Sequence, residues 1–269
     1  MSKDISRILG GWDFQPGKIS VRIVPGEDGR DKIQLRLDLG LLQMEFDGRP
    51  DGQRVSKDSE SWLEYYQRRQ KVHDTRYPDG PPFSLDNDDC SRLLREGVQY
   101  YHRYISFWRL ERYELCARDT SRNLKLFAFV REYAKDPKDK LLFDQYRPYV
   151  TMMHARAVAT PLVSLGDFDA ALRVIDAAVS GIRQFLTDYD QQQSAESCAE
   201  LNQLLEWRTE LEAKQPSKLS IGPEDRLERL RAELDTAIRE ERFEDAARLR
   251  DAIRQQFEDP LSPGTPELL

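Results

Sequence analysis

The sequence predicts a mainly α-helical protein: a small N-terminal antiparallel β-meander, an irregular helical bundle and a C-terminal α-helical hairpin on a linker. Apolar and polar residues alternate over residues 18–47, as in strands with one buried and one solvated face. From about residue 58 the apolar residues recur at intervals of three and four, the period of a helix. We therefore predict five regions: a meander region at 1–57, a helical body at 58–214, a linker at 215–223, a helical hairpin at 224–257 and a disordered tail at 258–269.

The composition narrows the class of protein. Of the 269 residues, 39% are hydrophobic and 33% are charged, a balance that favours helices with broad solvated faces over a deep α/β core. The net charge of −7 argues against strong attraction of the whole chain to nucleic acid or anionic lipid. The three cysteines, Cys90, Cys116 and Cys198, fit neither a disulfide framework nor a Cys-x-x-Cys zinc site. Because the first residues lack the apolar core of a signal peptide, we expect a cytoplasmic protein with no membrane contact.

Three runs of alternating apolar residues predict the three strands of the meander. Pro25 to Gly29 separates the first two runs, Gly40 separates the second and third, and the glycine-rich segment 47–52 ends the last. Three short strands are barely stable alone, so their apolar face is expected to pack on a helix. The alternating residues are Ile19, Val21 and Ile23, then Ile33, Leu35, Leu37 and Leu39, then Leu42, Met44 and Phe46.

Helical periodicity then continues through the body. We predict a first helix capped by Asp58 or Ser59, and a long helix over 88–117 with one apolar stripe. Further helices follow at about 124–135, at 138–165 with an interruption near Pro148, at 168–188 and at 195–214. The stripe of the long helix comprises Leu94, Val98, Tyr101, Ile105 and Trp108.

One pair of these predicted helices resembles a tetratricopeptide hairpin. Leu165 to Leu172 surrounds a tight Gly166-Asp167 turn, and the small residues Ala157 and Ala178 flank it. Small residues let two antiparallel helices approach closely, and glycine adopts the positive φ of such a turn. The sequence shows no second copy at the 34-residue period, which favours a single hairpin over a repeat array.

The segment after the linker carries apolar residues along one side of two short helices. The first stripe contains Leu227, Leu230, Leu234 and Ala237, and the second runs from Phe243 through Ile253 to Phe257. Two helices of about 15 residues bury little surface between themselves, so the stripe needs another partner. The partner is the body of this chain, a second copy or a different protein, and the linker favours a partner outside the body.

This segment resembles the UVR motif, the helical hairpin shared by the UvrB and UvrC subunits of bacterial excision repair and found in some Clp-type ATPases and arginine-kinase activators. The resemblance rests on Leu234-x-x-Ala237-x5-Phe243-Glu244-x-Ala246-Ala247-x-Leu249-Arg250-Asp251-x-Ile253. It implies pairing with a second hairpin, with Phe243, Ala246, Ala247 and Ile253 as packing residues. Leu230 and Leu234, from the apolar stripe, are further candidate interaction residues. Glu244, Arg250 and Asp251 would set the pairing geometry.

The rest of the sequence lacks the catalytic and zinc-binding regions that accompany this motif in other proteins. No segment matches the phosphate-binding pattern Gly-x4-Gly-Lys-Ser/Thr, no nuclease region is identifiable, and paired Cys-x-x-Cys sites are missing. The histidines, His73, His102 and His154, do not form a Glu-x-x-His metal pattern, and Asp47 and Asp51 are typical of turns. We predict a non-enzymatic adaptor with no catalytic residue, cofactor or metal, whose partner carries a matching hairpin or is a second copy.

Two alternatives remain. The first is a repair accessory that contacts nucleic acid through the body. Its candidate surface is the aromatic and basic run from Tyr100 to Tyr113, with Arg103, Arg109 and Arg112. Helical core spacing in that run and the overall acidity favour packing instead. The second alternative is an enzyme built on the helical body, which would require a deep pocket with converging titratable groups.

Overall fold

The structure is a computed structural model that describes residues 4–214 and seven residues further along: Leu230, Arg231, Leu234, Asp245, Leu249, Arg250 and Ile253. The chain divides into two compact units, residues 1–212 and 213–269. The predicted linker at 215–223 and the predicted tail at 258–269 lie outside the described residues, so these two regions remain predictions.

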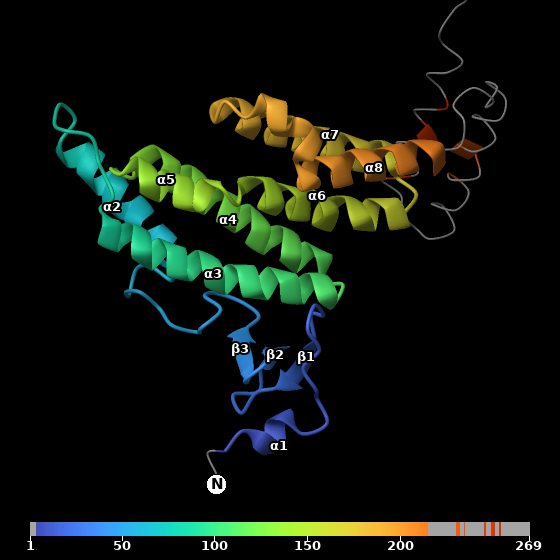
Figure 1. Cartoon of the computed structure of the whole chain (residues 1–269), viewed down its shortest axis with the longest axis horizontal. Coiled ribbons are helices and arrows are strands. Elements are labelled where there is room, and N and C mark those ends of the chain that lie inside the picture. Colours follow the sequence, from blue (N-terminus) through green and yellow to red (C-terminus); the bar gives the residue numbers. More distant parts are fainter. Residues whose placement is uncertain are drawn as a thin grey trace, which may run out of the picture. The chain divides into compact units, whose positions relative to one another are not determined.

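Within the described residues the chain is mainly α-helical with one small sheet, as predicted (Figure 1). The helices of the first unit stack on one another: α3 packs on α4, α4 on α6, and α6 on α7. The elements are α1 (Ser6–Leu9), β1 (Val21–Pro25), β2 (Asp31–Arg36), β3 (Leu41–Glu45), α2 (Trp62–Arg76), α3 (Asn87–Arg109), α4 (Tyr113–Tyr133), α5 (Pro137–Asp144), α6 (Arg147–Ser164), α7 (Phe168–Asp188), the 3-10 helix η1 (Gln192–Ser197) and α8 (Ala199–Lys214).

The three strands form the predicted antiparallel meander in the order β1-β2-β3. Ile33 and Leu35 of β2 are buried on the face that meets α3, and Met44 of β3 is buried beside them. The second strand is shorter than predicted, because the N–H of Leu37 donates to the carbonyl of Gly40 at 2.9 Å and closes a two-residue turn. Leu39 lies at the tip of that turn, where it is 90% exposed rather than part of the apolar face.

The first long helices begin at carboxylate or hydroxyl caps. Ser61, and not the predicted Asp58 or Ser59, caps α2: its hydroxyl accepts the N–H of Glu64 at 3.2 Å. Asp86 caps α3 through a reciprocal pair of bonds with Asp89. Such caps satisfy N–H groups that have no partner within the helix, and they fix where each helix starts.

The predicted helix over 88–117 is two helices. α3 ends at Arg109 and α4 begins at Tyr113, so the prediction of one helix was wrong. Glu111 adopts a left-handed φ of 58°, and the N–H of Arg112 turns back to the carbonyl of Phe107 at 2.9 Å. This α3–α4 corner, residues 110–112, reverses the chain so that α4 packs along α3.

The buried side of α3 also differs from the predicted stripe. Val98 and Tyr101 are 46% and 38% exposed, and Trp108 is half-buried. Ile105 of the predicted stripe is buried, and the other buried residues of α3 are Asp89, Cys90, Leu93, Glu96, Gly97, Tyr100, Arg103, Tyr104, Ser106 and Phe107. The helix lies between the sheet on one side and α4 on the other, so it buries a wider sector than one stripe, and that sector includes the charged residues Asp89, Glu96 and Arg103.

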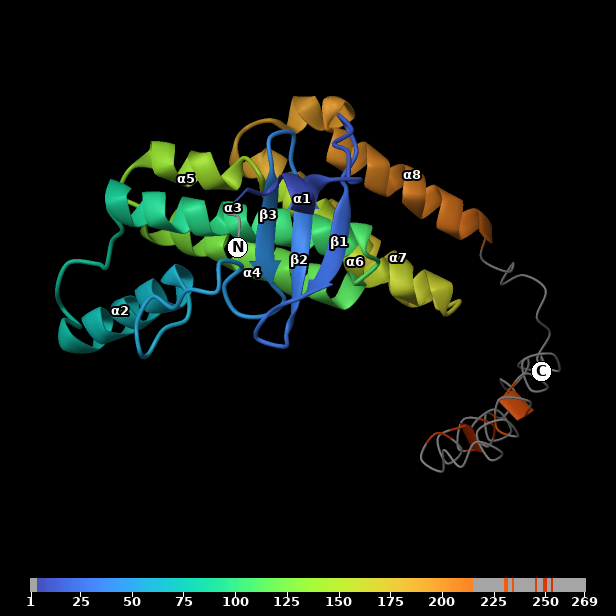
Figure 2. The same cartoon turned by 90° about the horizontal axis from the view of Figure 1, so that it is seen from below.

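The remaining helices follow the predicted order. The interruption predicted near Pro148 occurs at residues 145–146, between α5 and α6. Gly166 adopts a φ of 77° at the turn between α6 and α7, and Ala157, Ala171 and Ala178 are buried in this hairpin. The region predicted as one helix from 195 begins with η1, and α8 follows from Ala199. Figure 2 shows α6, α7 and α8 behind α3 and α4 when the sheet faces the viewer.

Candidate functional site

The predicted interaction residues that the structure describes are all helical. Leu230 and Leu234 are half-buried, and so is Ile253, whereas Arg250 is exposed. Leu230 and Leu234 are four residues apart, as are Leu249 and Ile253, and this spacing places each pair on one face of its helix. The other predicted residues, Phe243, Glu244, Ala246, Ala247 and Asp251, lie outside the described residues.

The first unit contains a buried ion pair that sequence reasoning missed. Asp119 of α4 accepts from Nε and Nη2 of Arg103 of α3 at 2.6 and 3.0 Å, and both side chains are 1% exposed. Nη1 of Arg103 also donates to the carbonyl of Glu45 at 3.0 Å. Arg118 donates from Nε to Asp119 at 3.0 Å and from Nη1 to Asp47 at 2.6 Å. The pair therefore ties α3 to α4 and both helices to the end of β3.

A buried glutamate of α3 joins four segments in the same way. Both carboxylate oxygens of Glu96, which is 0% exposed at its side chain, accept backbone N–H groups at the start of α2, from Trp62 at 2.7 Å and from Leu63 at 3.2 Å. Arg122 of α4 donates to Glu96, and Nε of Arg49 lies 3.6 Å from it. A negative charge at a helix N-terminus is stabilising, so this carboxylate anchors α2 on α3 and α4.

The histidines occupy structural positions. Nδ1 of His154, on α6, lies 3.0 Å from the hydroxyl of Thr120 on α4, and burial lowers the pKa of this histidine. Burial also lowers the pKa of His102, whose Nδ1 has no hydrogen-bond partner among the described residues. His73 packs its ring against Phe83, with centroids 5.8 Å apart. No group of three His, Cys, Asp or Glu side chains within the described part of the chain is arranged to hold a metal ion.

Asp51 lies in a turn and Cys116 is buried in the core. Gly48 and Gly52 adopt φ values of 62° and 70°, and Asp51 accepts the N–H of Gln53 at 3.0 Å, as in the predicted turn. Cys116 is 0% exposed, and burial raises its pKa to about 12. A thiol with that pKa is protonated at neutral pH and is a poor nucleophile.

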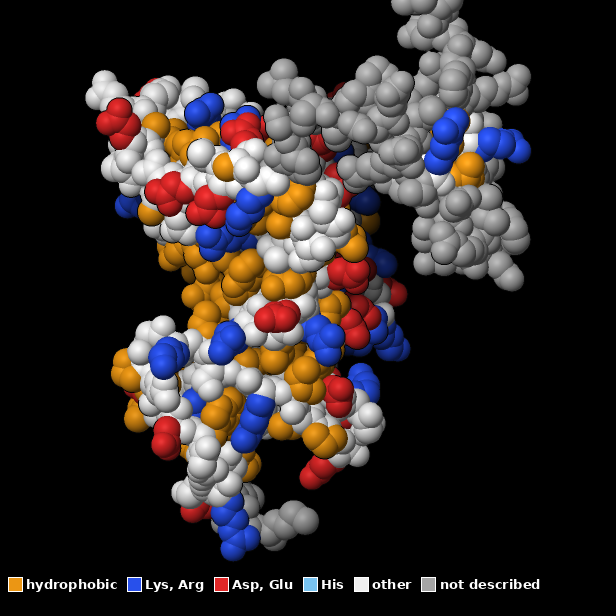
Figure 3. All heavy atoms as spheres, turned by 90° about the vertical axis from the view of Figure 1, so that its right-hand side faces the viewer, with side chains coloured by type: hydrophobic (Ala, Val, Ile, Leu, Met, Phe, Trp, Pro, Cys, Tyr) orange, Lys and Arg blue, Asp and Glu red, His pale blue; other side chains and the backbone are white. Residues whose placement is uncertain are grey.

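The aromatic and basic run from Tyr100 to Tyr113 is buried at residue 100 and at residues 103–107. Tyr100, Tyr104 and Phe107 are buried, and Arg103 is held by Asp119, so none of them presents a stacking surface to a nucleic acid. Arg109 and Arg112, in the last part of the run, are exposed. On the side that Figure 3 shows, hydrophobic side chains gather across the middle of the first unit, with acidic and basic groups around them. No helix in the described residues is both long and apolar enough to cross a membrane.

Comparison with known families matches residues 224–255 to the UVR family, described as the UvrB/uvrC motif. No curated protein and no solved structure matches the chain. The matched residues include all but the last two residues of the predicted hairpin at 224–257 and none of residues 4–214. Residues 224–255 of this chain therefore match a UVR motif, a segment associated with protein–protein interaction.

Proposed function

We propose that this protein is a non-enzymatic adaptor that uses its UVR motif to dock a second hairpin of the same type. The match of residues 224–255 to the motif is the observation that carries the proposal. Hairpins of this type pair as small four-helix assemblies, so the partner contributes the surface that two short helices lack.

The described residues of the motif support the proposal. Leu230, Leu234, Leu249 and Ile253 are helical and only half-buried, so part of each apolar side chain remains accessible in the single chain. Covering a large aliphatic side chain contributes about 1.5–3 kcal/mol. A second hairpin that covered several such residues would supply enough free energy for specific association.

The partner is a second copy of this chain or a protein of excision repair or Clp-type proteolysis that carries a UVR hairpin. Charged residues at the edge of the apolar stripe would choose between them, because like charges opposed across an interface destabilise it. Glu244, Arg250 and Asp251 are the residues proposed for this selection. The protein acts in the cytoplasm and needs no cofactor in this proposal.

A pair of substitutions in the first motif helix tests the proposal. We compare Leu234→Asp, at a half-buried position, with Arg231→Asp, at an exposed position three residues away. The full-length chain is titrated against itself by analytical ultracentrifugation, and against purified UvrB and a UVR-bearing Clp-type ATPase by calorimetry. Because a carboxylate on the stripe would be buried without a partner charge, Leu234→Asp should weaken association by about 10–100-fold.

The control separates docking from a general effect of the new charge. Leucine and arginine have similar helix propensities, so the two substitutions perturb the helix alike. Arg231→Asp should change the affinity by less than about threefold. Equal loss in both variants, or no association of the unmodified chain with itself or with either UVR protein, would show that the motif does not dock in this way.

A further inference from the structure

The outer edge of β1 presents backbone groups that no other strand of the described residues uses. β1 is a terminal strand of the sheet (Figure 2). The N–H of Arg36 donates to the carbonyl of Ser20 at 2.9 Å, and the N–H of Gly26 donates to Arg30 at 2.8 Å. Since hydrogen-bonding direction alternates along an antiparallel strand, the even-numbered residues of β1 face β2. The N–H and C=O groups of Val21 and Ile23 therefore point away from the sheet.

At the opposite edge of the sheet, formed by β3, other groups of the chain bond to the backbone. The N–H of Glu45, at the end of β3, donates to the carbonyl of Pro50 at 2.9 Å. The carbonyl of Glu45 accepts Nη1 of Arg103 at 3.0 Å. The chain thus occupies part of the β3 edge with its own groups. An exposed edge with unpaired N–H and C=O groups is a template for a further strand.

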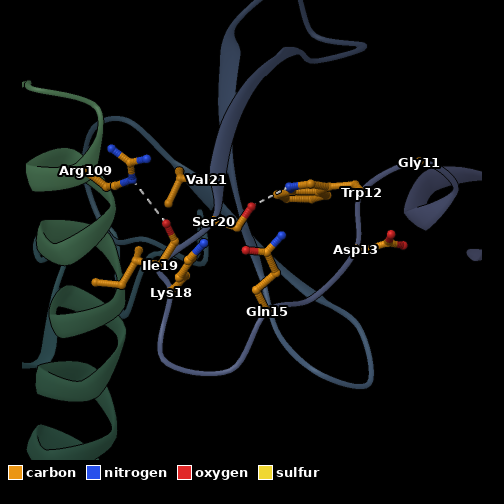
Figure 4. Close-up of a pocket in the computed structure, with 9 residues that line it drawn as sticks. All are labelled: Gly11, Trp12, Asp13, Gln15, Lys18, Ile19, Ser20, Val21 and Arg109. Carbon is orange, nitrogen blue, oxygen red and sulfur yellow. Dashed lines mark hydrogen bonds between the residues drawn. The ribbon is translucent and has the colours of Figure 1, made fainter.

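Two hollows adjoin β1, one at its Ser20 end and one beside Ile23 and Asp31, the residue that pairs with Pro25 in the sheet. The first, of about 890 Å³, is lined by residues 18–21 on one side and by Arg109 at the end of α3 on the other. Figure 4 shows Nε of Arg109 directed at the carbonyl of Ile19, 3.3 Å away, and the Trp12 indole N–H directed at the hydroxyl of Ser20, 2.7 Å away. The second hollow, of about 520 Å³, is lined by Ile23 and by residues 111–115 around the α3–α4 corner.

The two hollows carry opposite charge. The first is bordered by two cations and one carboxylate, and the second by three carboxylates and one arginine. A segment lying along β1 would therefore be best matched with an acidic residue at the Ser20 end and a basic residue at the Pro25 end. The residues concerned are Lys18, Arg109 and Asp13 at the first hollow, and the carboxylates of Asp31, Glu111 and Glu114 at the second.

We propose that the free edge of β1 is a docking site for an extended segment of another protein, which adds to the sheet as a fourth strand. The outward N–H and C=O groups of Val21 and Ile23 would bind the main chain of the segment. The charged hollows place the acidic residue of the segment at the Ser20 end of β1 and its basic residue at the other end, so a segment whose basic residue comes first lies antiparallel to β1. This site lies in the first unit and is independent of the UVR motif.

The test uses a defined peptide and the full-length protein. The probe is acetyl-Lys-Val-Thr-Val-Thr-Val-Asp-amide, and the control peptide replaces its central Val-Thr by Pro-Pro, which removes two N–H donors. Backbone amide exchange is followed by NMR. The probe should slow exchange at Val21 and Ile23 by about tenfold or more, while Arg22 and Val24, which already face β2, stay slow throughout. The control peptide should slow neither.

A charge-matched pair of variants tests the orientation. Lys18→Glu changes a residue at the first hollow, and Lys125→Glu makes the same change at an exposed position on α4. Lys18→Glu should weaken binding of the probe about fivefold, and Lys125→Glu should not change it. No added protection at Val21 and Ile23 with saturating peptide, or equal effects of the two variants, would overturn the proposal. Protection that rises with protein concentration alone would show that a second copy occupies the edge.

Discussion

Replacing Asp119 by Asn tests the buried ion pair that holds the first unit together. The substitution keeps the shape of the side chain but removes its charge and one of two acceptor oxygens. Asp119 accepts three hydrogen bonds from Arg103 and Arg118, and Arg103 is 1% exposed, so the variant leaves a guanidinium buried without its counter-charge. Breaking a buried pair from one side costs about 3–5 kcal/mol. We expect a loss of that size in the free energy of unfolding.

Asp47→Asn is the matched control, because Asp47 accepts from the same arginine, Arg118, but is 85% exposed. Its loss should be below about 1 kcal/mol. The assay is urea unfolding followed by tryptophan fluorescence, which reports on the first unit because the four tryptophans lie within residues 1–212. A cost for Asp119→Asn no larger than that for Asp47→Asn would refute the reasoning. If Asp119→Asn does not fold, the double variant Arg103→Met with Asp119→Leu should recover the fold, since it removes both charges.

Three further predictions follow from local geometry. Iodoacetamide at pH 8 should modify the half-buried Cys198 before Cys116, whose pKa of about 12 keeps it protonated, with peptide mass spectrometry as the readout. Burial lowers the pKa of His154, so the unfolded chain binds the proton more tightly than the folded chain does. The free energy of unfolding should therefore keep its full value above the ordinary histidine pKa of about 6.5 and fall as the pH drops below it. His154→Gln should make that decline shallower in urea titrations. Gly166→Ala should cost about 1–2 kcal/mol in the same titrations because Gly166 has a φ of 77°, whereas Gly97→Ala inside α3 should gain about 0.5–1 kcal/mol; the opposite order would contradict the assignment of these backbones.

The meander and the α6–α7 hairpin could be predicted because their signals are local. Alternation in Ile33 and Leu35 marks the face that packs on α3, and the Gly166-Asp167 pair marks a tight turn. The α3–α4 corner could not be predicted in this way. Its residues, Leu110 to Arg112, contain no glycine or proline, and Glu111 adopts its left-handed φ because α4 has to return along α3.

The buried charged residues could not be predicted from the apolar periodicity of one helix face, for a related reason. A helix that packs on two sides buries residues that a single apolar face leaves out, and Glu96 and Arg103 are two of them. Their partners, Arg122 and Asp119, come from the next helix, so the pairs exist only once the tertiary arrangement is known. An acid or arginine interleaved with buried aromatics, as in Tyr100-x-x-Arg103-Tyr104, is the signal that could have found them.

The candidate interaction residues were predicted from a short motif, and the family match confirms the motif at residues 224–255. Leu234 and Ile253 are helical and half-buried, and their role in pairing stays a prediction. The identity of the partner depends on how well two surfaces match, and the sequence of this chain describes only its own surface.

The most direct test of the central proposal is a binding titration of two chains in parallel: the full-length protein and a chain that ends at Lys214, where α8 ends. Each is titrated against the full-length protein and against a purified UVR-bearing partner. The proposal predicts saturable binding by the full-length protein and none by the chain that ends at Lys214, with both chains folded by circular dichroism. Undiminished binding by the shorter chain would contradict it.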